Sequence, residues 1–199
     1  MRLILHYIRD MSWYVVIGFI IGLIRLAFRH KRHKIKDKKH EILIILFIAY
    51  LAGLASQTII PRFDFGVASN TGFYFHVNIG SIRHINLIPF RTIAQQFAGE
   101  IGVNAKDIAS VAALNLAANL LLFFPLGFFL PAIGDKFTSF KRTILAGVSI
   151  VVLIETIQFF IGRSTDIDDV LLNTVGIAVG YGIYKGVKFL FHRLHHRDT

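Results

Sequence analysis

Long apolar runs alternate with short polar connections along the chain, and the runs have the length of membrane-spanning helices. About 20 mostly apolar residues cross a hydrocarbon core about 30 Å thick. Five runs reach this length: 11–28, 42–60, 111–130, 143–161 and 170–190. They lack the apolar/polar alternation of a membrane β-barrel. The pattern predicts an all-α integral membrane helical bundle of about five transmembrane helices.

The first run is the weakest of the five, because its uncharged stretch extends only from Met11 to Ile24. We expect Arg25 and Arg29 to reach toward the lipid headgroups. Arg2 and Arg9 precede the run, as in a signal peptide, but no small-residue cleavage site follows, so a retained helix is predicted. If this helix were only interfacial, four spans would remain.

Basic residues in the connections predict the orientation. The connection 29–41 carries seven Lys and Arg against two acids, and short basic connections stay in the cytoplasm. With five spans the N-terminus is then outside and the C-terminus cytoplasmic. The connection 61–110 and the turn 162–169 lie outside.

Composition agrees with a membrane protein. Of the 199 residues 54% are hydrophobic and 17% charged, whereas soluble domains average about 25% charged residues. The absence of cysteine excludes disulfides, thiol nucleophiles and Cys-ligated metals. The net charge of +10 gathers on the predicted cytoplasmic side without a nucleic-acid-binding motif, so it indicates orientation and contact with anionic membrane lipids.

The outer connection of about 50 residues is too long for a simple loop and is expected to have structure of its own. Within it, residues 82–97 (IRHINLIPFRTIAQQF) mix apolar side chains with Arg83, His84, Arg91 and Gln95. This mixture fits an element that lies on the outer leaflet. It fits equally a loop packed over the bundle.

Polar side chains inside the apolar runs are few, and such residues usually face a bundle interior or a wet cavity. At 1.5 Å per residue, Asn119, Glu155 and Asn173 lie roughly 6 to 12 Å below the outer surface. We therefore predict a polar ligand-binding pocket facing the outer leaflet. Its candidate residues are Asn86, Arg91, Asn115, Asn119, Glu155, Gln158, Arg163, Asp166, Asp169 and Asn173.

Each of these residues also has a purely structural interpretation. Asn and Gln commonly form hydrogen bonds between membrane helices, and Asp166 suits a helix cap. Glu155, set among apolar neighbours, must pair with a cation or become protonated, and Arg163 or Arg91 is the expected partner.

Small residues and prolines predict how the helices pack. The pairs Gly18/Gly22 and Gly176/Gly180 have GxxxG spacing, for which packing inside one bundle is favoured over dimerisation. Pro125 is expected to kink its helix.

Several segments together resemble the VanZ-like family: 86–90 (NLIPF), 119–131 (NLLLFFPLGFFLP), and a spaced run from Glu155 through Gln158, Arg163, Asp166, Asp169, Asn173 and Gly176 to Gly180. The resemblance implies a small multi-helix membrane protein of the cell envelope. The family is named for a member linked to low-level resistance to teicoplanin, a lipidated glycopeptide. The expected organisation is an N-terminal helix and basic loop (1–41), a VanZ-like membrane domain (42–192, with motifs at 86–180) and a short basic cytoplasmic tail (193–199).

Three functions remain open. In the first, the pocket binds a lipid-linked cell-wall precursor or a lipoglycopeptide, and Arg91 and Arg163 hold a phosphate. In the second, the protein is a membrane enzyme acting on a lipid phosphate or lipid-linked glycan, with Glu155, Asp166 and Asp169 as acid–base groups. The third is a proton-coupled transporter that uses Glu155 as a relay.

Other candidate chemistry has less support. Ser164 and His84 occur without a GxSxG or HExxH motif. The acids Asp166, Asp168 and Asp169 suit Mg²⁺ or Ca²⁺, but acids on a short turn more often cap a helix or face water. No cofactor or metal is therefore expected. The tail histidines His192, His195 and His196 are expected to be solvated.

Overall fold

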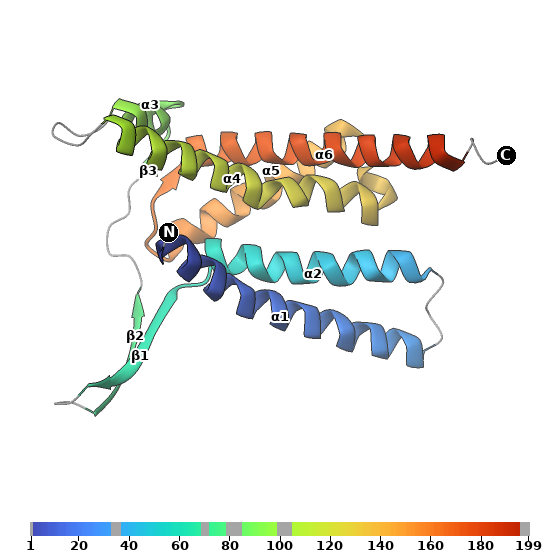
Figure 1. Ribbon diagram of the computed structural model, residues 1–199, viewed down its shortest axis with the longest axis horizontal. Helices are drawn as coiled ribbons and strands as arrows, with labels where there is room; N and C mark the ends of the chain where they lie inside the picture. Colours follow the sequence, from blue (N-terminus) through green and yellow to red (C-terminus); the bar gives the residue numbers. More distant parts are fainter. Residues whose placement is uncertain (1, 33–36, 69–71, 79–84, 99–104, 196–199) are drawn as a thin grey trace. The chain divides into compact units, whose positions relative to one another are not determined.

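The computed structural model describes residues 2–32, 37–68, 72–78, 85–98 and 105–195 (Figure 1). Five of its helices are long and apolar enough to cross a membrane, over Met11–Lys31, Lys38–Thr58, Leu116–Ile133, Phe140–Phe160 and Ile167–Leu194. The predicted all-α membrane bundle is confirmed, including the weak first run. The elements are α1 (Arg2–Lys31), α2 (Lys38–Thr58), β1 (Arg62–Ala68), β2 (Gly72–Asn78), β3 (Ile85–Asn86), α3 (Arg91–Ala98), α4 (Ala105–Ile133), the 3-10 helix η1 (Asp135–Phe137), α5 (Phe140–Phe160), β4 (Thr165–Asp166) and α6 (Ile167–His195).

The chain forms two compact units. The first comprises Met1–Ile85 and Ile154–Thr165, and the second Asn86–Leu153 and Asp166–Thr199. The boundary therefore passes through α5 and through the short strands β3 and β4, which pair as a two-stranded sheet. Each unit is described by itself.

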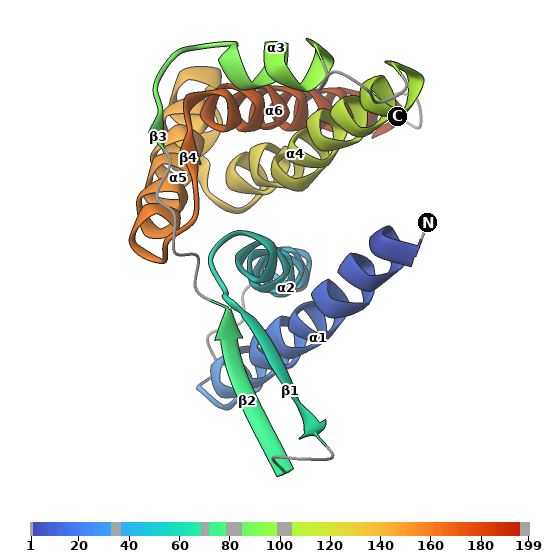
Figure 2. The ribbon, with the colours of Figure 1, turned by 90° about the vertical axis from the view of Figure 1, so that its left-hand side faces the viewer.

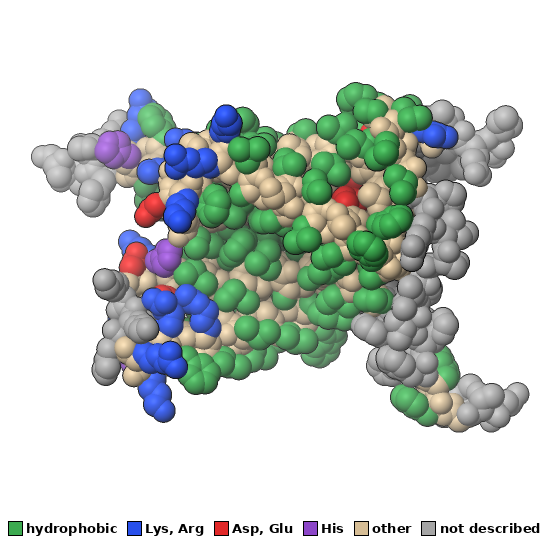
Figure 3. Space-filling model, turned by 180° about the vertical axis from the view of Figure 1, so that it is seen from behind, with side chains coloured by type: hydrophobic (Ala, Val, Ile, Leu, Met, Phe, Trp, Pro, Cys, Tyr) green, Lys and Arg blue, Asp and Glu red, His purple; other side chains and the backbone are tan. Residues whose placement is uncertain are grey.

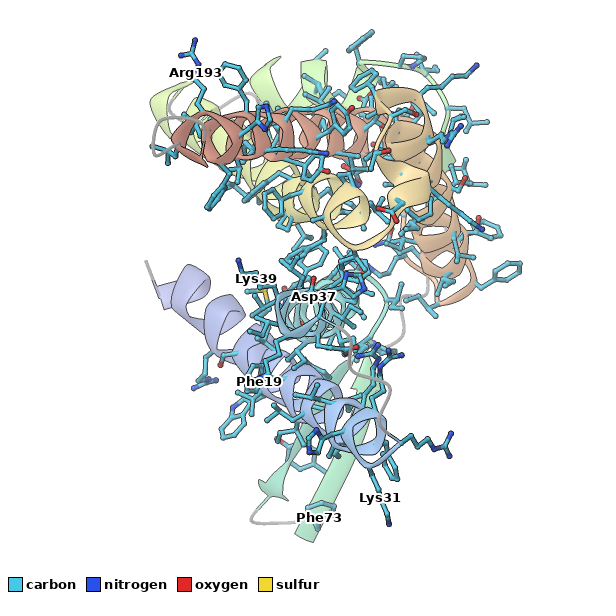
Figure 4. The ribbon with its side chains drawn as sticks, turned by 90° about the vertical axis from the view of Figure 1, so that its right-hand side faces the viewer. Phe19, Lys31, Asp37, Lys39, Phe73 and Arg193 are labelled. Atoms are coloured by element: carbon cyan, nitrogen blue, oxygen red, sulfur yellow. The ribbon has the colours of Figure 1, made fainter. Side chains whose placement is uncertain are left out.

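The α1–α2 pair forms the body of the first unit (Figure 1). A Cβ atom added to Gly18 would lie 2.7 Å from Ala52 Cβ and 2.8 Å from Ala49 Cα, so the helices approach where only glycine fits. The pair Gly18/Gly22 thus packs within the chain, as predicted. Asp37 caps α2 by accepting a hydrogen bond from the Lys39 backbone N–H at 2.8 Å (Figure 4).

An ion cluster joins α1 and α2, and it contains the two arginines that are expected to reach toward the lipid headgroups. Arg25 Nη1 lies 2.5 Å and Arg29 Nε 2.9 Å from the carboxylate of the buried Glu41. A buried carboxylate on the facing helix needs cationic partners, and both arginines supply them. That the two arginines also reach toward the lipid headgroups stays a prediction. The cluster ties the C-terminal end of α1 to the N-terminal end of α2.

A β-hairpin follows α2 and confirms that the long connection after this helix has structure of its own. Strands β1 and β2 are antiparallel, with a register from Arg62 opposite Asn78 to Ala68 opposite Gly72. Gly72 has a φ of 76°, which favours glycine. Phe73, beside it, is exposed near the end of the hairpin (Figure 4).

Helices α4 and α6 form the centre of the second unit (Figures 1 and 2). A Cβ atom added to Gly180 would lie 1.8 Å from Phe124 O, and one added to Gly176 would lie 2.7 Å from Leu120 O. This glycine pair also packs within the chain. The buried core around the contact contains Phe123, Leu126, Val151 and Ile177.

Hydrophobic side chains cover much of the helix surfaces, while Lys and Arg gather near helix ends (Figure 3). On α6 the exposed Val175, Val179 and Ile183 repeat at intervals of four residues, which places them on one face of the helix. Such an exposed apolar stripe is typical of a surface that faces lipid.

Candidate functional site

The family-like motif 86–90 and the turn before α6 meet at the N-terminal end of α6 (Figure 2). Asn86 Nδ2 donates hydrogen bonds to Asp166 Oδ1 at 3.0 Å and to Thr92 Oγ1 at 3.0 Å. The Thr92 hydroxyl donates to Asp166 Oδ2. Two predicted site residues, Asn86 and Asp166, are therefore directly bonded, and Thr92 joins them.

Asp166 also caps α6. Its Oδ1 accepts a hydrogen bond from the Asp168 backbone N–H at 2.9 Å, which satisfies a donor that the first turn of a helix leaves unpaired. The capping role suggested by the sequence is confirmed.

Asp168 is the residue whose role the sequence analysis missed. Its carboxylate, 1% exposed, accepts hydrogen bonds from the backbone N–H groups of Phe90 (2.5 Å), Thr92 (2.8 Å) and Ile93 (3.1 Å). Phe90 takes a φ of 64°, which is rare for a bulky residue. Asp168 thus caps the start of α3 from a distant helix.

A signal for this cap exists in the sequence. Residues 87–90 (LIPF) contain no Ser, Thr, Asp or Asn to cap a helix that begins at Arg91. Its first N–H groups need an acceptor from elsewhere in the fold. The signal becomes readable only once the short helix itself is known.

A second polar group lies between α4 and α6. Asn119 Nδ2 donates to Asp169 Oδ1 at 2.9 Å. Asn173, one turn along α6 from Asp169, is 4% exposed, and its Oδ1 has no hydrogen-bond partner within the described part of the chain. Asn119 is next to Leu120 in α4, and Asn173 lies about one turn before Gly176 in α6, so both are close in sequence to the contact between Gly176 and Leu120.

Two other predicted residues, Arg91 of α3 and Asn115 of α4, have no described hydrogen bond in either polar group. Arg91 is exposed in the first turn of α3. Asn115 lies in α4, but its side chain is outside the described residues, as is His84.

The first unit holds its own polar group. Gln158 Nε2 donates to Thr58 O at 2.9 Å, and Arg163 Nη1 donates to Thr58 O at 2.9 Å and to Gln57 O at 3.2 Å. Both side chains therefore satisfy carbonyl groups at the C-terminal end of α2. Glu155 is buried, and its backbone O accepts from the Thr165 hydroxyl at 3.2 Å. The predicted pairing of Glu155 with Arg163 or Arg91 stays a prediction.

The acids of the turn bind protein donors. Asp166 and Asp168 accept backbone and side-chain hydrogen bonds around α3, while Asp169 accepts from Asn119. Among the described residues no group of three or more His, Cys, Asp or Glu is placed to hold a metal ion.

Comparison with known proteins gives one match. The VanZ/LLP1 protein family matches residues 47–191, which is most of the chain. No curated protein and no solved structure matches the chain. The matched range contains the polar group of Asn119, Asp169 and Asn173, the polar group of Gln158 and Arg163, and the cap of α3.

Proposed function

The chain belongs to the VanZ/LLP1 family, and on that premise we propose that it binds a lipid-linked or lipidated ligand at the outer leaflet of the cell membrane. The five apolar helices and the family indicate a multi-pass membrane protein. The proposed orientation has the N-terminus outside and the C-terminus in the cytoplasm. The proposal rests on one observation: Asn173 Oδ1 is buried and has no hydrogen-bond partner among the described residues.

A buried carbonyl oxygen without a hydrogen bond costs about 1 to 3 kcal/mol. Lipid offers no donor to relieve that cost. The carboxyl group of Asp169, which accepts a hydrogen bond from Asn119, adds acceptor oxygens one turn away. The chemical complement of this group is a ligand with hydrogen-bond donors, such as the hydroxyl groups of a glycan or the amide N–H groups of a peptide.

The depth of Asn173 suits the polar part of a membrane-bound ligand. It lies six residues into α6 and so about 9 Å from the helix start. At this depth lipid headgroups meet acyl chains. A cell-wall precursor on a lipid carrier and a lipoglycopeptide both place glycan and peptide donors beside a lipid tail there. The exposed Arg91 supplies a guanidinium for a phosphate.

The first unit's Glu155, Gln158 and Arg163 form a second proposed set of ligand contacts. Teicoplanin resistance, by analogy with the family's namesake, is the antibiotic phenotype to examine. The enzyme alternative has less support because the Asp166 carboxylate is occupied by Asn86, Thr92 and the Asp168 N–H. A general acid or base must reach the substrate.

Mass spectrometry of lipids that co-purify with the full chain tests the proposal. Wild-type protein should retain a polyprenyl-phosphate-linked lipid or bind added teicoplanin, and Asn173→Leu should reduce the bound amount at least tenfold. Leu is close to Asn in size, and the substitution removes the unpaired carbonyl, so the fold should persist. Val175→Leu, on the exposed side of α6, is the matched control and should retain wild-type binding.

Two results would contradict binding at this site: undiminished ligand on Asn173→Leu, or no binding of either ligand class by wild-type protein. Turnover of a lipid phosphate that is abolished by Asp169→Asn would favour the enzyme instead.

A further inference from the structure

Four consecutive apolar residues, Leu87, Ile88, Pro89 and Phe90, are exposed in the second unit, and we refer to them as the anchor segment. The exposed fractions of Leu87 and Phe90 are 71% and 64%. Such a contiguous apolar patch marks a surface that contacts something other than water.

The backbone of the anchor segment is held from both ends. At its start, the Ile88 N–H donates to Asn86 Oδ1 at 3.2 Å, and Asn86 itself is bonded to Asp166. At its end, the Phe90 N–H donates to Asp168 at 2.5 Å. The polar backbone therefore faces protein acceptors while the apolar side chains project outward.

The anchor segment lies at the level of the membrane boundary. Asp168 is the second residue of α6, whose candidate span covers 28 residues. At 1.5 Å per residue that span is about 42 Å long, which equals the bilayer thickness including the headgroups. The first turn of α6, and Phe90 bonded to it, therefore sits in the headgroup region of one leaflet.

Lipid is the occupant that fits this patch. Val175, Val179 and Ile183 form an exposed apolar stripe along α6, the helix whose first turn holds the segment through Asp168. The exposed Arg91 follows directly and suits lipid phosphates. An apolar group beside a cation is typical of interfacial anchors.

We propose that the anchor segment inserts into the leaflet at the N-terminal end of α6. Asp166, through Asn86, and Asp168 fix its backbone conformation by hydrogen bonds. The segment is then a rigid interfacial anchor of the transmembrane bundle. This inference uses none of Asn119, Asp169 or Asn173, on which the proposed ligand site rests, and Arg91 is the one residue that both proposals share.

The absence of cysteine makes the test direct, because single-cysteine variants carry no background label. Leu87→Cys and Ile88→Cys are labelled with a nitroxide in nanodiscs of phosphatidylcholine and phosphatidylglycerol. Power saturation then compares accessibility to oxygen with accessibility to a water-soluble nickel chelate. The controls are Lys136→Cys, exposed on η1, for water and Val179→Cys, exposed on α6, for hydrocarbon.

Both anchor labels should be accessible to oxygen and at least fivefold less accessible to nickel than the Lys136→Cys label. Nickel accessibility equal to that of the water control would overturn the proposal. Protection from both reagents would overturn it too, because protein would then cover the segment.

The holding role is tested by adding Asp168→Asn to the Ile88→Cys variant. The nitroxide should become more mobile and gain at least twofold in nickel accessibility, while circular dichroism shows unchanged helix content. Asp135→Asn, an exposed acid on η1, is the control and should change neither property. An unchanged spectrum for Asp168→Asn would reject the role of Asp168.

Discussion

The carboxylate of Asp168 lies 2.8 Å from the backbone nitrogen of Thr92, although 76 residues separate the two in the chain. This bond joins the motif before α3 to the start of α6. It explains why an apolar segment without capping residues can precede a helix, since the cap comes from another helix. The family-like motif 86–90 and the start of α6 thus belong to one hydrogen-bonded group.

Asp168→Ala should release the start of α3. Three backbone N–H groups lose a charged acceptor, and the loss should destabilise this region by about 3 kcal/mol. Hydrogen exchange of residues 90–98 in nanodiscs should become at least tenfold faster. Asp135→Ala is the control and should leave the exchange rates unchanged. Unchanged rates in Asp168→Ala would show that α3 is held by other contacts.

Gly180→Ala should separate α4 from α6. The added Cβ would lie 1.8 Å from Phe124 O, so backbone has to move, and we expect a loss of about 3 kcal/mol or more. Gly182→Ala on the same helix meets no atom within 4 Å. It should leave stability unchanged or raise it by up to about 1 kcal/mol. Thermal unfolding in detergent measures both, and equal melting temperatures would refute the close contact.

Glu41→Gln should weaken the α1–α2 pair by leaving two arginines without their counterion. The arginine side chains are 31% and 39% exposed, so water screens part of the effect and the expected loss is about 2 kcal/mol. A double-mutant cycle with Arg25→Gln isolates the pair, and the two losses should not add. Arg32→Gln, exposed beyond α1, is the control. Additive losses would argue against the ion pair.

The proposed orientation predicts that a reporter fused after Lys39 lies in the cytoplasm and one fused after Gly99 lies outside. The basic connection 29–41 sets this direction. Paired reporters active on opposite sides of the membrane measure it directly. The reverse result would place the polar group of α4 and α6 in the inner leaflet, and it would exclude an outer-leaflet ligand.

The candidate site shows which of its contacts can be predicted from the sequence and which cannot. The sequence indicates both Asn119 and Asp169 as candidate pocket residues, and the fold brings them into a hydrogen bond. The shared depth that helix rise predicts for Asn119, Glu155 and Asn173 stays a prediction.

By contrast, nothing near Asp168 in the sequence indicates that it caps α3. Only the fold shows this, because α3 and α6 are far apart in the chain. The sequence places Glu41 in the basic connection, and its burial against Arg25 and Arg29 depends on how two helices face each other.

The sequence by itself determined the five spans and the all-α class, because a helix in lipid satisfies its own backbone and needs only a continuous apolar run. It also determined the family through the spaced polar motifs. Only the tertiary structure decided which donor meets which acceptor across the fold. Hydrogen bonds act over about 3 Å, so Asp168 meets Phe90 only after helices distant in sequence have packed. The same packing leaves Asn173 Oδ1 without a partner in the described part of the chain.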